Sequence, residues 1–357
     1  RLAALDGGVG AIATASGMSA VATTVFTLLR AGDHIVASSS VYGGTYNLLS
    51  VTLPRLGITT TFVDAHDPKA FEAAIQPTTK LVYTETLGNP KLDFVDIAAV
   101  ADVAHAHGLP LVVDNTLTPI LCRPIDHGAD IVIYSLTKYF SGNGTAMGGA
   151  VVDSGKFDWT NGKFPDFTEP SPGYHGLRYS ETFGPAAFIV RARVEGLRDI
   201  GACLSPTNSF LIIQGLETLS LRIKQSSQSA LEIARWLQQH PAVEWVHYPG
   251  LEQDEHHKIC KRYLDGGFGC IITFGLKGGY EAAKSFADHT KLFRIVANLG
   301  DTKSLVIHPS STTHRQLSPE QQVSAGVTPD LVRLSIGLED IEDLKADIEQ
   351  AILEATR

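Results

Sequence analysis

The sequence of 357 residues has only four cysteines, and none of them stands in a C-x-x-C pair. This spacing excludes a disulfide framework and a zinc ribbon, and it is expected of a protein in a reducing compartment such as the cytoplasm. The thirteen histidines show no recognisable metal-ligand spacing, so no metal site is predicted. No apolar run approaches the roughly 20 residues that span a bilayer, so no membrane contact is expected.

Clusters of lysine and arginine are missing as well, and the formal net charge is −9. These features argue against a nucleic-acid-binding surface. The length suits two α/β domains, which we expect to cover 1–215 and 216–357. The residues after Arg1 look like the end of a helix stopped by glycines. We therefore expect that an N-terminal arm upstream of Arg1 is missing from the printed sequence.

Apolar runs alternate with helical patterns through the first half of the chain. The expected strands are 34–39, 58–64, 80–86, 109–115, 130–137 and 148–153. The expected helices between them are 18–30, 45–56, 68–75 and 96–107. Such alternation predicts a mostly parallel central sheet with helices on both faces. Ligands of sheets of this kind bind beyond the carboxyl ends of the strands.

The second half of the chain has a different pattern. Residues 156–179 are rich in Gly, Pro, Phe and Tyr and are expected to form a long ordered loop. Long helical patterns follow at 188–203 and 210–240, with Asn208 or Ser209 as the expected cap of the second. A smaller α/β domain should then contain strands at 245–247, 269–274 and 331–336 and helices at 280–289 and 340–354.

Polar residues at two of the strand ends point to one cofactor. Lys138 supplies an amine that can form an imine, Asp114 ends an apolar run, and Ser135 and Thr137 place hydroxyl groups beside the lysine. Enzymes that use pyridoxal 5′-phosphate (PLP) attach it to a lysine and pair its pyridinium nitrogen with an acidic group. Taken singly, Lys138 also reads as a solvated lysine and Asp114 as a helix cap. The combination predicts a PLP site with Lys138 as the catalytic residue.

Other residues fit around such a cofactor. The run Ser16–Ser19 precedes a helix and suits a phosphate, although an ordinary N-cap explains it as well. Tyr42 can stack on the pyridine ring or lie on the surface. Asn89 can donate to the phenolic oxygen of the ring, while Asn-Pro is also a plain turn signal. Arg333, inside an apolar strand, needs either a substrate carboxylate or a structural ion pair.

In order along the chain, these segments resemble the Cys/Met-metabolism family of PLP-dependent enzymes, which has the aspartate aminotransferase-like fold (type I of the PLP-dependent transferases). The matching segments are Ser16–Ala20, Tyr42–Thr45, Glu85 with Asn89-Pro90, Val113–Thr116, Ser135–Lys138 and Arg333–Asp340. Three further stretches are similar to the O-acetylhomoserine sulfhydrylases of this family, namely Ser171–Leu177, Gly215–Leu219 and Gly300–His314. Methionine γ-lyases typically carry Cys where this chain has Gly44, which lowers that reading.

The resemblance implies a role for each site residue. The implied cofactor-binding residues are Gly17, Met18, Tyr42, Asn89, Asp114, Ser135, Thr137 and Lys138. The backbone N–H groups of Gly17 and Met18 would contact the phosphate, and Tyr42 would be a second acid/base beside Lys138. The implied substrate-binding residues are Arg333, Ser304 and Asn89.

The activity implied is PLP-dependent γ-replacement on O-acetyl-L-homoserine by sulfide or a thiol, which gives L-homocysteine or a methionine analogue and acetate. The partners implied are these small molecules and further copies of the chain in a homotetramer of active dimers. Cystathionine γ-synthase, cystathionine γ-lyase and O-succinylhomoserine sulfhydrylase remain alternatives. A remote alternative is an acyl-serine hydrolase, because Ser135 and Lys138 match S-x-x-K, although the companion motifs are absent.

Overall fold

The computed structural model describes residues 1–316, 318–324 and 326–357, and the chain forms two compact units. The first unit contains Arg1–Leu87, Phe94–Thr137 and Met147–Phe210. The second contains Gly88–Asp93, Lys138–Ala146 and Leu211–Arg357. The chain therefore passes from one unit to the other several times. The division into a large cofactor-binding domain, 1–215, and a smaller C-terminal domain, 216–357, stays a prediction.

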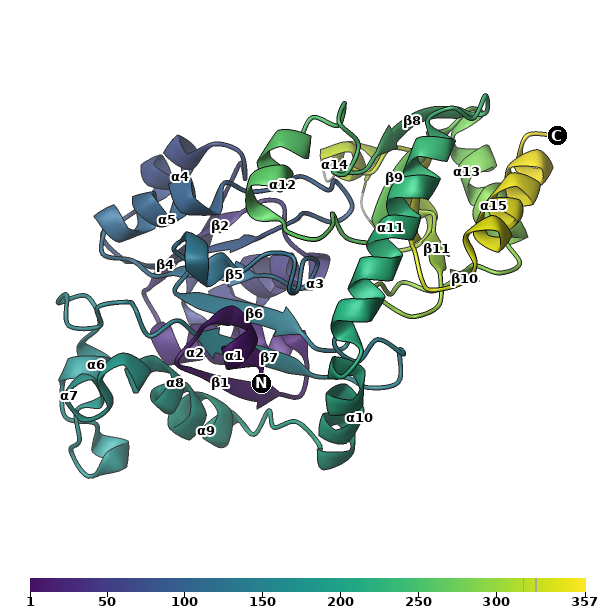
Figure 1. Ribbon diagram of the computed structural model, residues 1–357. Coiled ribbons are helices and arrows are strands. Elements are labelled where there is room, and N and C mark those ends of the chain that lie inside the picture. Colours follow the sequence, from purple (N-terminus) through teal and green to yellow (C-terminus); the bar gives the residue numbers. More distant parts are fainter. Residues whose placement is uncertain (317, 325) are drawn as a thin grey trace. The chain divides into compact units, whose positions relative to one another are not determined.

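The first unit is built on a seven-stranded sheet with the order β1-β7-β6-β5-β4-β2-β3 (Figure 1). The strands are β1 (Gly10–Thr14), β2 (His34–Ser38), β3 (Thr59–Val63), β4 (Thr79–Glu85), β5 (Leu111–Asp114), β6 (Ile131–Ser135) and β7 (Gly149–Asp153). Strands β2 to β6 pair in parallel, and β7 pairs antiparallel with both β6 and β1. The prediction of a mostly parallel sheet is confirmed.

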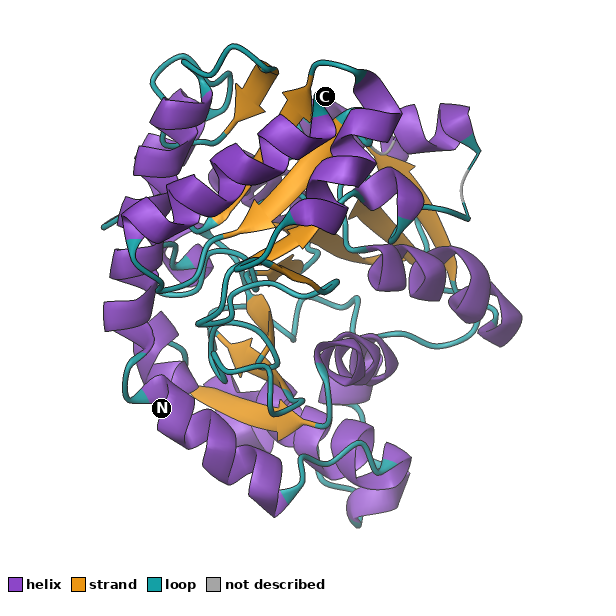
Figure 2. Ribbon diagram, turned by 90° about the vertical axis from the view of Figure 1, so that its right-hand side faces the viewer, coloured by secondary structure: helices purple, strands orange, loops and turns teal. Residues whose placement is uncertain are grey.

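Helices cover both faces of this sheet (Figure 2). They include α1 (Leu2–Asp6), α2 (Gly17–Leu28), α3 (Gly43–Asn47), α4 (Pro68–Ala74), α5 (Ile97–Ala106) and α8 (Ala187–Arg191). Helices α2 and α8 share one core with strand residues such as Tyr83, Val112 and Ile133. Because side chains alternate between the faces of a strand, Asp114 and Ser135 lie on the face of α2, and their neighbours point to the opposite face.

The predicted loop at 156–179 is ordered by aromatic packing. Trp159 stacks on Phe167 with ring centroids 4.4 Å apart, and it meets Phe164 edge-on at 5.1 Å. The segment contains a short helix, α6 (Pro165–Thr168), and leads into α7 (Tyr179–Phe183). The helical pattern at 188–203 is divided into α8, a π-helical turn at Ala192–Leu197 and α9 (Arg198–Ile200).

The second unit contains a five-stranded sheet with the order β10-β11-β12-β9-β8. Its strands are β8 (Val243–His247), β9 (Ile271–Leu276), β10 (Arg294–Ile295), β11 (Leu305–Ile307) and β12 (Leu331–Ser335). Its helices are α11 (Leu219–Leu237), α12 (His257–Tyr263), α13 (Gly279–His289), α14 (Pro319–Ser324) and α15 (Ile341–Ala355). Within the described ranges, no helix combines the length and apolar character that a membrane crossing requires.

Helix α10 (Pro206–Leu216) runs from the end of the first unit into the second. The prediction that Asn208 or Ser209 caps a helix here is wrong, because both lie inside α10. Ser205 precedes the helix, and its hydroxyl accepts a hydrogen bond from the Asn208 backbone at 3.1 Å. The expected single helix at 210–240 is interrupted between α10 and α11.

Candidate active site

An anion site forms in the first unit where α2 begins beside the end of β6. The Ser16 hydroxyl accepts from the Ser19 backbone N–H at 3.1 Å, so Ser16 is the N-cap. The N–H groups of Gly17 and Met18 have no partner inside the helix. A Cβ atom at Gly17 would lie 2.8 Å from that of Ser135, so only glycine lets the helix approach this strand so closely. The helix N-terminus and the Ser135 hydroxyl together suit a phosphate.

Thr137 is held differently from Ser135. Its hydroxyl oxygen lies 3.2 Å from the Gly148 backbone nitrogen and 3.3 Å from the Gly148 carbonyl oxygen. These contacts join the segment after β6 to the residue before β7. The alternative S-x-x-K hydrolase reading is wrong, because that motif requires Ser135 to open a helix, whereas here it ends a strand.

Asp114 is a half-buried acid at the end of β5. Its carboxylate accepts from the Thr116 backbone N–H at 2.9 Å, and no helix begins there, so it is not a helix cap. Burial raises the pKa of Asp114 to about 6. In the described part of the chain, no Lys, Arg or His pairs with this carboxylate. A pyridinium N–H on the face shared with α2 would supply the missing positive charge, so the residue fits the predicted cofactor.

Tyr83 lies beside Asp114 on the same face of the sheet. Burial, together with the charge of Asp114, raises the pKa of its phenol well above the usual value. Its hydroxyl makes no hydrogen bond of good geometry, although Asp114 and Thr45 are neighbours. Tyr83 therefore stays protonated, and its hydroxyl can donate to a negative neighbour.

Tyr42 is held by its backbone and leaves its ring accessible. Its backbone N–H donates to the Glu85 carboxylate at 2.7 Å, and its side chain is 55% exposed. A Cβ atom at position 44 would lie 2.5 Å from the Tyr42 ring, so Gly44 makes room for this ring position. An exposed ring at a strand end is available to stack on a ligand.

In the second unit, Lys138 donates from Nζ to Oδ1 of Asn298 at 2.5 Å. Burial, with a smaller contribution from the charge of Arg333, lowers the pKa of the Lys138 amine to about 8. Sequence reasoning missed Asn298, which lies in the irregular segment between β10 and β11. The stretch that carried the family resemblance there begins only at Gly300.

Arg333 is buried on β12 and also lacks an ionic partner. It donates from one terminal nitrogen to Oδ1 of Asn89 at 3.1 Å and from the other to the Asn298 carbonyl at 2.8 Å. Its Nε has no hydrogen-bond partner, and burial lowers the pKa of the guanidinium to about 10. Among the described residues, no carboxylate pairs with it, so the structural ion pair left open by the sequence is not found. An anionic ligand such as a substrate carboxylate would satisfy it.

Ser304 is fully buried, and its hydroxyl is engaged. It donates to Oε2 of Glu339 at 2.8 Å and accepts from the Gly337 backbone N–H at 2.8 Å. The Ser304 backbone N–H donates to Oε1 of the same carboxylate at 2.8 Å. These contacts favour a supporting role, in which Ser304 joins the start of β11 to the segment after β12. Its direct contact with substrate stays a prediction.

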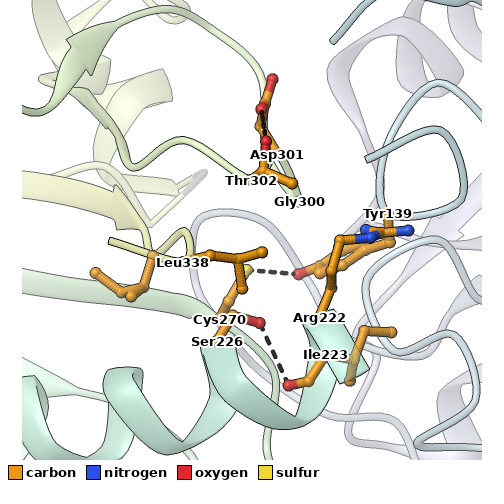
Figure 3. Close-up of a pocket in the computed structure, with 10 residues that line it drawn as sticks. Tyr139, Arg222, Ile223, Ser226, Cys270, Gly300, Asp301, Thr302 and Leu338 are labelled. Atoms are coloured by element: carbon orange, nitrogen blue, oxygen red, sulfur yellow. Dashed lines mark hydrogen bonds between the residues drawn. The ribbon is translucent and has the colours of Figure 1, made fainter. Parts of the chain in front are cut away.

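A small cavity in the second unit is lined in part by Tyr139, the residue after Lys138 (Figure 3). Tyr139, Arg222 and Cys270 are among its lining residues, and the Tyr139 hydroxyl lies 3.1 Å from the Cys270 sulfur. The cavity volume of about 10 Å³ suffices for roughly one water molecule. It is too small for a cofactor or an amino acid. Across the described ranges, no three His, Cys, Asp or Glu side chains gather in a way that could hold a metal ion.

The predicted site residues thus form two groups. The first unit brings together the anion site at α2, Asp114 and the Tyr42 segment; the second brings together Lys138, Asn89 and Arg333. The two groups of site residues are joined along the sequence, because Thr137 of the first unit is directly followed by Lys138 of the second.

Comparison with known proteins identifies the family to which this arrangement belongs. The family model for Cys/Met metabolism PLP-dependent enzymes matches residues 1–353. The O-acetyl-L-homoserine sulfhydrylase of Leptospira meyeri is 54% identical, and the match covers 99% of this chain and 82% of that protein. The homocysteine synthase of Schizosaccharomyces pombe is 52% identical, with 99% of this chain and 83% of that protein covered.

Solved structures agree with these relatives. A structure described as an O-acetylhomoserine (thiol)-lyase from Campylobacter jejuni matches with a TM-score of 0.95 and 42% identity over 99% of this chain and 85% of that chain. It carries a pyridoxyl-lysine monophosphate group. The predictions of the type I fold and of PLP as cofactor are therefore confirmed. The chain belongs to the Cys/Met metabolism family of PLP-dependent enzymes.

Proposed function

We propose that the protein is an O-acetylhomoserine sulfhydrylase. It replaces the acetoxy group of O-acetyl-L-homoserine with sulfide to give L-homocysteine and acetate, or with a thiol to give a methionine analogue. Relatives named for this activity are 54% and 50% identical and cover 99% of the chain. The structural observation that carries the proposal is the buried Arg333 without an acidic partner, which Asn298 links to the low-pKa Lys138. A buried cation near a reactive amine suits an α-amino acid, whose carboxylate the cation would bind.

PLP, when bound, withdraws electrons from the α-carbon of the substrate and so makes its proton easier to remove. The N–H groups of Gly17 and Met18 would hold the phosphate, together with the hydroxyls of Ser135 and Thr137. Asp114 would pair with the ring nitrogen, because an ionised acid in this place favours the protonated ring. Tyr42 would stack on the ring.

Lys138 would be the base that removes protons from the substrate carbons. Because burial lowers the pKa of its amine to about 8, a sizeable fraction is neutral at slightly alkaline pH and can act as a base. It would remove the proton from the α-carbon, release that proton, and then remove one from the β-carbon, which allows acetate to leave from the γ-carbon with the electrons of the C–O bond. Hydrosulfide then forms the new C–S bond at the γ-carbon, and protons return to the β- and α-carbons. Asn298 holds the amine in place by its side-chain carbonyl. Tyr42 would act as a second acid or base.

Arg333 and Asn89 would hold the amino-acid end of the substrate. The guanidinium can bind a carboxylate bidentately, and its unpartnered Nε leaves a donor for this purpose. Asn89 accepts from Arg333 through Oδ1 and keeps its amide N–H groups for the ligand. Fixing the carboxylate keeps the α-carbon within reach of the base.

Replacement of Lys138 by alanine tests the proposal most directly. We expect turnover to fall by roughly 10³-fold or more, since the variant loses both the attachment point and the base. Borohydride reduction of the wild-type holoenzyme should label the peptide that contains Lys138. The surface variant Lys277→Ala is the matched control and should keep full activity. Full activity in Lys138→Ala would contradict the proposal.

Substrate preference separates this function from its nearest alternatives. O-acetyl- and O-succinyl-homoserine should be compared as acyl donors, and sulfide and cysteine as acceptors. The proposal expects acetate release with sulfide to be the fastest reaction. Faster turnover with cysteine would indicate a cystathionine γ-synthase, and faster succinate release would indicate an O-succinylhomoserine sulfhydrylase.

We also propose that the enzyme is a cytoplasmic homotetramer. The free cysteines, of which Cys122, Cys260 and Cys270 are buried, support a reducing compartment. Each unit exposes large apolar side chains, Phe210 at 61% in the first and Leu221 at 70% in the second. Such side chains are common at subunit contacts. Light scattering of the holoenzyme tests the oligomeric state.

A further inference from the structure

Buried polar side chains form a series of hydrogen bonds on the back of the first unit's sheet, which is the face opposite the proposed cofactor face. The series begins at Asp6 on α1, whose Oδ1 accepts from the Tyr134 hydroxyl at 2.8 Å. The Tyr134 oxygen accepts in turn from the Asn115 side-chain amide at 2.9 Å. Asp6 is 3% exposed, Tyr134 1% and Asn115 0%. The function proposed above uses neither Asp6 nor Tyr134.

Two hydrogen bonds in series lead toward Asp6, one from the Asn115 amide to the Tyr134 oxygen and one from the Tyr134 hydroxyl to Asp6. The Asn115 amide donates both to Tyr134 and to the Cys122 carbonyl, the latter at 3.0 Å. Its Oδ1 must therefore accept, and it does so from the Thr118 hydroxyl at 2.6 Å. Burial raises the pKa of Asp6 to about 6, against the opposing effects of Tyr134 and Arg123, so the carboxylate is ionised at pH 8. A charged acceptor at the end of the series strengthens every donor behind it.

The same series of hydrogen bonds fixes the segment that carries Asp114. Asn115 is the next residue, and its backbone N–H donates to the Ile133 carbonyl at 2.9 Å. The Asp114 carbonyl accepts from the Thr86 backbone N–H at 3.0 Å. Because neighbouring residues of an extended chain point to opposite faces, locking the Asn115 side chain on the back sets the direction of Asp114 on the front.

Thr116 makes two further hydrogen bonds to residues on the cofactor face of the sheet. Its backbone N–H donates to the Asp114 carboxylate at 2.9 Å, and its hydroxyl accepts from the Ser135 backbone N–H at 2.7 Å. Asp114 at the end of β5 and the two residues that follow it, Asn115 and Thr116, are therefore held on the front, the back and the front of the sheet in turn. Loss of the Tyr134 contact removes one of the hydrogen bonds that hold Asn115, which lies between the two residues held on the front.

We propose that Asp6 is a positioning residue for the cofactor: through Tyr134 it fixes the turn that carries Asp114. This inference rests on the assignment of Asp114 to the ring nitrogen made above. It gives a function to a carboxylate whose second oxygen, Oδ2, is buried without a hydrogen-bond partner. Asp6 itself contacts neither cofactor nor substrate in this assignment.

The test measures PLP affinity and the visible absorption band of the bound cofactor in holoenzyme and reconstituted apoenzyme. Asp6→Ala and Tyr134→Phe should each weaken PLP binding roughly tenfold, as expected when a supporting partner is removed, and should shift the band. The double variant should bind PLP little more weakly than either single variant, because both substitutions interrupt the same series of hydrogen bonds. Asp6→Asn keeps an acceptor oxygen for Tyr134, so it should restore most of the affinity and is the variant to use if alanine prevents folding.

A matched control lies at the opposite end of the same strands. Asp130 is 3% exposed, and its carboxylate accepts from the Leu111 backbone N–H at 2.8 Å and contacts His105. Asp130→Asn should lower thermal stability but leave PLP affinity and the absorption band unchanged. Unchanged PLP affinity in both Asp6→Ala and Tyr134→Phe would overturn the proposal, and so would an equal loss in Asp130→Asn. If Asp114→Asn changes neither PLP affinity nor the band, the assignment of Asp114 fails by itself, whatever Asp6 does.

Discussion

Each unit has a candidate site residue of opposite charge for which the described residues provide no ionic partner, Asp114 in the first unit and Arg333 in the second. In the first unit, the half-buried Asp114 is an acid whose pKa desolvation raises to about 6, and no Lys, Arg or His of the described residues pairs with it. In the second unit, the half-buried Lys138 and the buried Arg333 are bases whose pKa values desolvation lowers to about 8 and 10, and no carboxylate of the described residues pairs with either. Both arrangements cost folding free energy in the protein alone. The difference indicates which part of a ligand each unit suits, a positive ring nitrogen in one case and a carboxylate in the other.

Arg333→Lys tests the anion-binding side of this comparison and should have the largest effect. Lysine keeps the charge but loses the fork that binds a carboxylate at two points. We expect the KM for O-acetylhomoserine to rise about 100-fold, with little change in PLP affinity. Steady-state kinetics with varied substrate measure this.

Arg222→Lys is the control for Arg333→Lys, since Arg222 is also buried in the second unit but bonds to the Gly215 carbonyl and to Thr218. It should lower stability without raising KM. If Arg333→Lys leaves KM unchanged, the carboxylate of the substrate is held elsewhere.

Asp114→Asn tests the other side and should have opposite effects with and without cofactor. PLP affinity should fall roughly 30-fold, because the ring nitrogen loses its ionic partner. A raised carboxyl pKa contributes stability below pH 4 that is lost as the pH rises through about 6. The variant removes this loss, so without cofactor it should be more stable than wild type at pH 8, by on the order of 3 kcal/mol.

Urea unfolding of apoprotein and holoenzyme measures both effects of Asp114→Asn. Lower stability of the variant apoprotein at pH 8 would show that Asp114 has a cationic partner in solution.

The pH dependence of PLP capture by apoprotein tests the lowered pKa of Lys138. Only the neutral amine attacks an aldehyde, so capture should accelerate about tenfold between pH 7 and 9, around the pKa of about 8. Stopped-flow absorbance measures the rate, and Nα-acetyllysine serves as the reference for titration of PLP itself. A capture rate that keeps rising steeply to pH 10 would mean that the amine has its ordinary pKa.

Asn298→Asp sharpens the same measurement and has the smallest expected effect. A carboxylate in place of the amide favours the charged amine, so the midpoint of capture should move upward by about one pH unit. Asn298→Ala removes an acceptor without adding a charge and should move the midpoint slightly downward. A midpoint that is the same in all three proteins would separate Asn298 from Lys138.

Much of the first unit could be predicted because its strands are long, apolar and regularly spaced. Strands β2 to β7 were all expected within two residues of their bounds, and the ends of β5 and β6 carry Asp114 and Ser135 as predicted. Strand β1 was missed, since Ile12 is the one large apolar residue in Gly10–Thr14. A strand this poor in apolar residues forms because it hydrogen-bonds to a neighbouring strand, here β7, which is distant in sequence.

The site residues that stand at the ends of strands were predicted from the sequence. Those whose role depends only on contacts with residues distant in sequence were missed. Asn298 lies in an irregular segment and gains its role only from its contacts with Lys138 and Arg333. Asp6 read only as a helix end, because nothing in its neighbourhood predicts a bond to Tyr134, which is 128 residues away. For Arg333, the pattern predicted burial but could not choose between an ion pair and a ligand.

One boundary between the compact units falls at the peptide bond from Thr137 to Lys138, and another falls between Leu87 and Gly88, two residues before Asn89. No single cut of the gene can therefore separate one unit from the other. A shuffled gene that exchanged the C-terminal half for that of a relative would leave the reactive amine with its original neighbours in sequence but with foreign Asn298 and Arg333 counterparts. A functional exchange of segments between relatives would therefore have to keep Lys138, Asn298 and Arg333 from the same parent.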